Sequence, residues 1–285
     1  MILVTGATGK LGALVVNKLL QKNAKIAVGV RTPGKAAALA EQGVDVRQLD
    51  YEQPDTIATA LQGVERVLLI SSNDLEQRLA QHRAVIDTAR AAGVKQLAYT
   101  SMLRADTSRM ELAIPHRETE VYLRGSGVPY TILRNAWYLE NHTEWLGAAI
   151  AHGAIIGAAG EGRFASATRE DLAEAAAIVL TGEGHVNQTY ELPGDSAYTL
   201  TELAAAAAKA SGKTVVYRDL PQADYEAALA GMGLPPALAR ALADADEWAA
   251  KGELDRQEGG SLRALIGRES TPMDQAVAAM VTGAS

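Results

Sequence analysis

The first 134 residues alternate between short apolar runs and longer amphipathic segments, and this alternation constrains the fold more than any other feature. A short apolar run bounded by turn residues predicts a strand buried on both faces, whereas an apolar face with a period of 3.6 residues predicts a helix. Most of the predicted helices end at glycine, the usual residue after a helix. We therefore predict an α/β fold with a Rossmann-type doubly wound parallel sheet. The predicted strands are residues 2–6, 25–31, 44–50, 64–72, 94–101 and 128–134.

The composition excludes several classes of function. The chain has no cysteine, so disulfides and thiolate chemistry are absent, and its five histidines show no spacing typical of metal ligands. The net charge of −7 argues weakly against a nucleic-acid partner, because phosphate binding needs a basic surface. No apolar run reaches the ~18 residues of a membrane span, and no signal peptide is recognisable. We expect a cytoplasmic protein without a metal, and the sequence leaves open whether it forms a homodimer.

Three glycines stand three residues apart where the first strand passes into the first helix. The spacing is GxxGxxG rather than the more common GxGxxG, but the strand–turn–helix context is the one that dinucleotide binding requires. Gly6 permits a tight turn, Gly9 lets backbone N–H groups approach a pyrophosphate, and Gly12 lets the helix pack closely on the sheet. The alternative is a turn that merely favours glycine. The predicted phosphate loop is Gly6, Ala7, Thr8, Gly9, Lys10, Leu11 and Gly12.

Cationic residues follow the second predicted strand. An NAD-specific site usually has a carboxylate there to bind the ribose 2′-hydroxyl, but this chain has Arg31, followed by Lys35. A guanidinium pairs well with a phosphate, so we expect NADP(H) as the cofactor. The alternative is that Arg31 is an ordinary surface arginine. Asp50, which ends the third strand, is expected either to accept a bond from the adenine amino group or to cap a helix.

The second half of the chain is less regular. It predicts helices at 169–182 and 199–212, the second of them capped by a threonine, and strands at 187–194 and 214–220. We expect residues 1–134 to form the NAD(P)-binding Rossmann domain and residues 164–194 to return to it. Residues 135–163 and 195–285 are expected to form a small C-terminal α/β lobe over the carboxyl ends of the strands, where ligands of α/β folds bind.

Several blocks of the sequence together resemble the NmrA-like atypical short-chain dehydrogenases. The blocks are TGATGKLG, VRTPGKAAALAEQGVDVRQLDY, LLISS, VPYTILRNAWYLEN and GAAGEGRFASATREDLAEAAA, and the resemblance runs from Met1 to about Gly267. Within the family the chain looks like the bacterial NAD(P)H:quinone oxidoreductase type 2 group, with triphenylmethane reductases as near relatives. The resemblance implies NADPH binding and a substrate cleft formed by the C-terminal lobe.

The resemblance also implies roles for residues after the later strands. Ser71 and Ser72 would line the cofactor after the fourth strand, and Thr100 and Ser101 would end the fifth strand near the nicotinamide ribose. The residues expected to border the nicotinamide and the substrate are Asn135, Trp137 and Tyr138, with Ser166 to Arg169 returning to the cleft.

The chain departs from the wider superfamily at its usual YxxxK pair. Leu112 stands where the tyrosine would be, and His116 stands where the lysine would be. The usual proton donor is therefore missing, which favours an activated acceptor such as a quinone, since its reduced anion is delocalised and water can protonate it. His116 and Tyr138 are the candidate catalytic residues. For His116 the alternatives are a positioning role, or a histidine that is simply hydrogen-bonded on a helix face.

Two functions follow from these observations. The first is an NADPH-dependent oxidoreductase that transfers hydride to a quinone or a similarly activated conjugated acceptor, with Trp137 and Tyr138 offering flat apolar surface to its ring. For both side chains the alternative is core packing. The second function is a non-enzymatic NADP(H)-sensing regulatory protein of the NmrA type, because the missing YxxxK pair is compatible with it too.

Overall fold

The computed structural model describes residues 1–255 and 260–283. Within them the chain forms two compact units, and the first comprises residues 1–106, 114–135 and 169–191. Its centre is a seven-stranded parallel sheet with the strand order β3-β2-β1-β4-β5-β6-β9, which confirms the predicted Rossmann-type fold. The strands are β1 (Ile2–Thr5), β2 (Ile26–Val30), β3 (Asp45–Gln48), β4 (Arg66–Leu69), β5 (Gln96–Met102), β6 (Tyr130–Asn135) and β9 (Gln188–Leu192).

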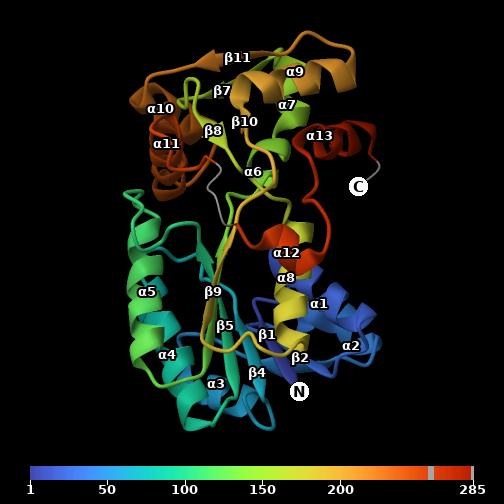
Figure 1. The fold of residues 1–285 in the computed structure, drawn as a ribbon, viewed down its shortest axis with the longest axis vertical. Coiled ribbons are helices and arrows are strands. Elements are labelled where there is room, and N and C mark those ends of the chain that lie inside the picture. The colour runs from blue at the N-terminus through green and yellow to red at the C-terminus, as the bar shows by residue number, and fades with distance from the viewer. Residues whose placement is uncertain (256–259, 284–285) are drawn as a thin grey trace. The chain divides into compact units, whose positions relative to one another are not determined.

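Helices cover both faces of this sheet. Figure 1 shows α3, α4 and α5 on one side and α1 with α8 on the other. The direction of the strand order changes between β1 and β4, because β1 pairs with β2 on one side and with β4 on the other. The helices of this unit are α1 (Lys10–Gln21), α2 (Ala37–Glu41), α3 (Pro54–Ala60), α4 (Arg78–Ala91), α5 (Ala113–Gly125) and α8 (Arg169–Thr181), and a 3₁₀ turn, η1, spans Pro33–Ala36.

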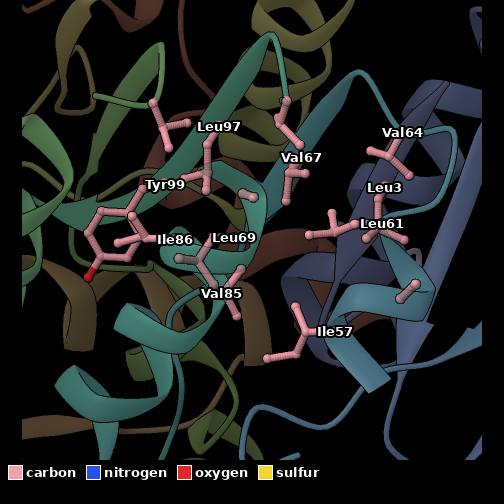
Figure 2. Close-up of a cluster of buried hydrophobic side chains, with 14 of the residues drawn as sticks. Leu3, Ile57, Leu61, Val64, Val67, Leu69, Val85, Ile86, Leu97 and Tyr99 are labelled. Atoms are coloured by element: carbon pink, nitrogen blue, oxygen red, sulfur yellow. The ribbon is translucent and has the colours of Figure 1, made fainter. Parts of the chain in front are cut away.

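A hydrophobic core fills the space under α3 and α4. Figure 2 shows side chains of β1, β4 and β5 gathered with side chains of the two helices. These residues are completely or almost completely buried, as the continuous apolar strands predict. Strand β3 differs from that prediction, because it lies at the edge of the sheet and exposes Asp45 and Gln48. The labelled core residues are Leu3, Ile57, Leu61, Val64, Val67, Leu69, Val85, Ile86, Leu97 and Tyr99.

The second unit comprises residues 107–113, 136–168 and 192–285. Residues 107–113 contact α11 (Pro236–Ala250) of this unit: the Glu111 N–H donates to the Asp244 carboxylate at 2.8 Å, and Arg240 pairs with the Glu111 side chain. Helix α9 begins with the expected threonine cap, in which the Thr199 hydroxyl and the Glu202 carboxylate accept each other's backbone N–H. The elements are α6 (Glu140–Thr143), α7 (Leu146–His152), β7 (Ala154–Gly157), β8 (Arg163–Phe164), β10 (Tyr198–Thr199), α9 (Leu200–Ser211), β11 (Val216–Asp219), α10 (Gln222–Gly231), α11 (Pro236–Ala250), α12 (Leu262–Ile266) and α13 (Met273–Thr282).

Two short sheets belong to this second unit. Strands β7 and β11 pair in parallel, and β8 pairs with β10 in the antiparallel sense. Among the described residues, no helix combines the length and apolarity needed to cross a membrane. The same residues contain no cluster of three or more potential metal-ligating side chains.

The start of α1 depends on the missing side chain of Gly12. A Cβ atom added there would lie 2.2 Å from the Gly6 carbonyl oxygen and 2.9 Å from the Ala7 Cα, so only glycine fits. Gly6 itself has a φ of +59°, in the left-handed region that glycine tolerates best. Gly6 has the turn conformation that the sequence predicts, whereas Gly12 is needed for the approach of the helix to the turn itself; together they set the helix directly after β1.

We expect Gly12→Ala to destabilise the protein by about 1–3 kcal/mol, because the added methyl group overlaps backbone atoms that cannot move independently. The measurement is urea unfolding followed by circular dichroism. Gly125→Ala is the control, since a Cβ atom there meets no atom within 4 Å. Equal unfolding midpoints for parent and Gly12→Ala would contradict the close approach of α1 to the turn.

Candidate functional site

The turn between β1 and α1 lies at the surface and is closed by a hydrogen bond of 2.9 Å from the Gly9 N–H to the Gly6 carbonyl. Gly6, Thr8, Gly9 and Lys10 are exposed, whereas Ala7 is buried. Gly9 is the N-cap of α1, and no side chain caps the helix. The positive end of the helix dipole therefore coincides with N–H donors at an exposed turn, which is the arrangement that binds a phosphate. A Cβ atom at Gly9 would meet only the Gly6 carbonyl oxygen, at 3.1 Å, so the fold itself leaves room there.

Two cations follow β2 in the same unit. Arg31 and Lys35 are both exposed, and Lys35 lies in the 3₁₀ turn η1. Neither forms an ion pair with any residue that the structure describes. Their charges are therefore available to an anionic ligand, as a 2′-phosphate would require.

Asp50 stabilises the turn that leads to α3. Its carboxylate accepts the Glu52 N–H at 3.1 Å and the Gln53 side-chain amide at 3.2 Å. The N-cap of α3 is Gln53, so Asp50 supports the start of the helix without being its cap. An additional contact of Asp50 with adenine stays a prediction.

The segment after β4 lies beside the glycine turn. A Cβ atom built on Gly6 would be 3.5 Å from the Ile70 Cβ, so the two residues face each other closely. The Thr5 hydroxyl accepts the Ile70 N–H at 3.1 Å, and the Tyr51 hydroxyl bonds to both the Thr5 hydroxyl and the Ile70 carbonyl. Burial raises the pKa of Tyr51, so the phenol keeps its proton. These contacts tie together the carboxyl ends of β1 and β4, where the strand order changes direction and where ligands of open α/β sheets bind.

Thr100 and Ser101 point to opposite faces of β5, as successive strand residues do. The Thr100 hydroxyl accepts the Ser71 N–H at 2.9 Å and so belongs to the segment after β4. Ser101 instead donates its hydroxyl to the buried Glu120 of α5 at 2.6 Å. Of the two, only Thr100 is brought together with Ser71 by the fold.

A buried ion pair joins β6 to α5 and β9. Arg134 donates to both Glu120 carboxylate oxygens, at 2.9 and 2.6 Å, and to Glu191 at 2.7 Å. Burial alone would lower the pKa of Arg134, but the hydrogen bonds to Glu120 and Glu191 outweigh it and raise that pKa. Arg134 and Glu120 are almost inaccessible, whereas Glu191 is partly exposed, so the buried Arg134–Glu120 pair holds the strand end in place.

His116 of α5 is buried, and both of its ring nitrogens are engaged. Its Nε2 lies 3.2 Å from Arg78 Nη1, and its Nδ1 lies 2.7 Å from the Tyr99 hydroxyl. Arginine can only donate, so Nε2 accepts and Nδ1–H donates. Burial, together with the charge of Arg78, holds the pKa of His116 well below its usual range. A neutral, enclosed imidazole favours the positioning role over that of an acid.

His82 of α4 is equally enclosed. Its Nε2 accepts the Ser72 N–H at 3.0 Å, and its Nδ1 lies 3.0 Å from the Thr119 hydroxyl. Burial and the charge of Arg78 lower the pKa of His82 to about 3. Arg78 also donates from Nε to the Ser72 carbonyl at 2.7 Å, so one helix holds Ser72 at two backbone atoms.

Asn135 and the two aromatic residues follow one another where β6 ends. Asn135 is buried, and its carbonyl accepts the Leu103 N–H at 3.0 Å. Trp137 and Tyr138 are partly buried and belong to the second unit, and the buried Trp137 Nε1 has no hydrogen-bond partner among the described residues. Ala167 forms a parallel bridge with Tyr138, so residues 166–168 lie beside the aromatic pair within that unit.

A shallow hollow of about 480 Å³ on β3 and α3 does not contain these residues. The guanidinium of Arg47 in that hollow already binds the Asp45 carboxylate and the carbonyls of Ala60 and Gln62, at 2.7 Å in each case. The hollow therefore offers no uncommitted cation to an anionic ligand.

The sequence matches the model of one protein family, the NmrA-like family, over residues 1–275. The chain belongs to the NmrA-like family. Quinone oxidoreductase 2 of Escherichia coli (strain K12) is 52% identical over 279 residues, which are 97% of this chain and 97% of that protein. The family named by the sequence resemblance is thus confirmed.

Solved structures extend the comparison. The crystal structure of the NADPH-dependent quinone oxidoreductase from E. coli complexed with NADPH matches with a TM-score of 0.93 and 52% identity, covering 97% of this chain and 98% of that one. The Citrobacter sp. triphenylmethane reductase complexed with NADP(H) matches with a TM-score of 0.92 and 40% identity, over 100% of both chains.

Sequence reasoning missed the side chains that hold the segment after β4. Arg78 and His82 stand at helical spacing with Val85, Ile86 and Ala89, on the buried face of α4. With Gln81, three polar residues lie on this buried face, and they are a signal because buried polar groups need partners. The pattern alone does not say which partners they have.

We expect the protein to prefer NADPH to NADH, and we expect Arg31→Ala to remove most of that preference. Loss of a charged contact to the 2′-phosphate should weaken NADPH binding by about 1.5–3 kcal/mol and leave NADH binding almost unchanged. The measurement is a fluorescence titration of both nucleotides. Equal affinities of the parent for the two nucleotides would contradict the role of Arg31.

We also expect acid to destabilise the protein through His82. Its pKa is about 3 in the folded protein and near 6.5 in the unfolded chain, so the unfolded state binds the proton first. The free energy of unfolding should therefore fall as the pH drops from about 6.5 towards 3, by up to about 1.4 kcal/mol per pH unit.

His82→Gln cannot titrate, so between pH 7 and pH 5 it should lose about 2 kcal/mol less than the parent loses. Urea unfolding at both pH values measures the difference. Parallel pH profiles for the two proteins would show that His82 is not held neutral.

Proposed function

We propose that this chain is an NADPH-dependent reductase that transfers hydride to a quinone or a similarly activated conjugated acceptor. The observation that carries the proposal is the nearly full-length match, at 52% identity, to the NADPH-dependent quinone oxidoreductase of E. coli in its NADPH complex. The residues of this chain fit the cofactor, because the uncapped start of α1 and the cations after β2 suit a dinucleotide phosphate.

The pyrophosphate binds the backbone N–H groups of the turn from Gly6 to Gly12. Arg31 and Lys35 bind the 2′-phosphate. Bound NADPH supplies the hydride, and the protein supplies binding and orientation. The bound dinucleotide is bordered by residues at the ends of β4, β5 and β6, namely Ser71, Ser72, Thr100 and Asn135. Ser101 does not contact it but fixes the end of β5 through Glu120 and Arg134.

The proton that completes quinone reduction does not need a side-chain acid. Leu112 stands where the superfamily has its tyrosine, and its side chain has no acidic proton to donate. His116 is neutral, and both of its ring nitrogens are engaged in hydrogen bonds. A reduced quinone is a delocalised anion that water can protonate, whereas an alkoxide formed from a ketone needs an acid in the transition state. The proposed acceptor class therefore matches the side chains that the chain provides.

Trp137 and Tyr138 contact the acceptor in this proposal. They follow β6 directly, and the buried Trp137 Nε1 is a hydrogen-bond donor that no described residue uses. A flat ring with a carbonyl oxygen suits an aromatic surface with one such donor. We propose no role for Tyr138 in catalysis beyond this contact with the acceptor.

The experiment that tests the function is NADPH oxidation with a panel of quinones, followed by the absorbance of the reduced nicotinamide. A reductase turns over NADPH with at least one quinone. A protein that binds NADPH tightly and oxidises it with none of them would instead be the NADP(H)-sensing regulator.

We expect His116→Ala to lower kcat for the quinone by about tenfold or less, because the imidazole only positions Arg78 and Tyr99. A general acid would contribute about 10²–10⁴-fold. Steady-state kinetics measure the effect, with NADPH deuterated at the transferred position to confirm that hydride transfer limits the rate. A loss above about a thousandfold with unchanged NADPH affinity would identify His116 as the proton donor.

A further inference from the structure

The backbone of Ile70, Ser71 and Ser72 is satisfied almost completely by side chains of the same unit. The Ile70 N–H and carbonyl bond to Thr5 and Tyr51, the Ser71 N–H bonds to Thr100, and the N–H and carbonyl of Ser72 bond to His82 and Arg78. The Ser71 carbonyl oxygen is the exception, since it has no hydrogen-bond partner among the described residues.

The direction of the hydrogen bonds through His82 is determined by its neighbours. The Ser72 N–H can only donate, so His82 Nε2 accepts, and Nδ1 therefore carries the proton and donates it to the Thr119 hydroxyl. Thr119 in turn donates its own hydroxyl proton to the Pro115 carbonyl at 2.8 Å. This chain of donors specifies a single neutral tautomer of His82.

The peptide between Ser71 and Ser72 is trans, so its carbonyl and its N–H point in opposite directions. His82 binds the N–H from the side of α4, and the Ser71 carbonyl therefore points away from α4. We propose that His82 is a positioning residue for NADPH: by accepting the Ser72 N–H, it aims the Ser71 carbonyl oxygen to accept a hydrogen bond from a hydroxyl or amide group of the dinucleotide. The inference rests on the proposed function, because it assumes a dinucleotide at this edge of the sheet.

The place of this carbonyl in the fold supports its role. The Ile70 N–H binds the hydroxyl of Thr5, the residue before Gly6, so Ser71 follows directly on the link between the ends of β1 and β4. Here the strand order changes direction, which is where dinucleotides bind in open α/β sheets. A carbonyl left without a partner at such a place is an acceptor for a ligand that carries donors, and a dinucleotide carries hydroxyl and amide donors.

The chain has two further features that keep the carbonyl in this orientation. Arg78 binds the Ser72 carbonyl and the His116 ring, so the peptide after Ser72 is held from the same helix. Burial keeps the His82 imidazole neutral, with its pKa lowered to about 3, so Nε2 remains an acceptor at neutral pH. A protonated imidazole would present a second N–H to the Ser72 N–H and release the peptide.

The test compares the NADPH affinity of the parent with that of His82→Leu and His82→Gln. His82→Leu removes the acceptor of the Ser72 N–H and should raise both the Kd and the KM for NADPH about tenfold, with the KM for the quinone unchanged. His82→Gln places an amide oxygen near the position of Nε2 and should restore affinity to within about threefold of the parent. Binding is followed by nucleotide fluorescence at a temperature where circular dichroism shows each variant folded.

The control is His185→Leu in the same unit. His185 Nδ1 lies 2.7 Å from the Tyr190 hydroxyl, the same type of pair as His116 and Tyr99. Its backbone carbonyl accepts the Thr131 hydroxyl near the start of β6, so it lies at the amino end of the sheet. This variant should bind NADPH within about twofold of the parent.

A second variant covers the case in which His82→Leu does not fold. Thr119→Val has nearly the shape of threonine but removes the acceptor of the Nδ1 proton, so the imidazole can carry its proton on Nε2 instead. It should weaken NADPH binding by about three- to fivefold. If the folded His82→Leu or Thr119→Val binds NADPH as tightly as the parent, the positioning role is overturned, even where the melting temperature falls.

The measurements of NADPH binding do not depend on whether the protein reduces a quinone. A parent protein that binds NADPH but reduces no quinone would overturn the reductase function, and the binding data would still decide the role of His82. A parent that does not bind NADPH would overturn both.

Discussion

The arrangement at the carboxyl edge of the sheet depends on the approach of α1 to the turn at Gly6. Because residue 12 has no side chain, the first turn of α1 packs directly on the Gly6 carbonyl and the Ala7 Cα. This contact places the uncapped start of the helix at the end of β1, and Thr5 just before the turn binds the Ile70 N–H after β4. A larger residue at position 12 would displace the helix and, with it, the donors that suit a phosphate.

The second feature of this edge is that side chains satisfy its irregular backbone. Threonines on β1 and β5 and a histidine on α4 accept the N–H groups of Ile70, Ser71 and Ser72, so the segment is rigid without being part of a strand. Satisfied polar networks of this kind make a segment rigid, and here the Ser71 carbonyl is the group left for a ligand. Neutral imidazoles suit such networks well, since each has one donor and one acceptor and carries no charge to desolvate.

The side chains of this region also fit the reaction that the NmrA-like relatives suggest. In the reductase that we propose, Leu112 and the enclosed His116 stand in place of the tyrosine and lysine of the wider superfamily, and catalysis rests on binding and orientation of the substrates. A quinone tolerates this, because its reduction needs hydride transfer far more than proton donation. The absence of a tyrosine acid at position 112 and the proposed use of a quinone as acceptor therefore agree with each other.

The sequence by itself determined the alternation of strands and helices, the glycine turn, the cations after β2 and the family. The first three features are local, since each depends on residues a few positions apart in the chain. Only the tertiary structure showed that Ser101 is committed to Glu120, that Asp50 supports a turn, and that His82 and Arg78 hold Ser72. Apart from the local contacts of Asp50, the partners come from separate elements: His82 and Thr119 are 37 positions apart and Arg78 and His116 are 38 apart. No periodicity encodes such pairs, because they depend on how helices α4 and α5 pack on the same face of the sheet.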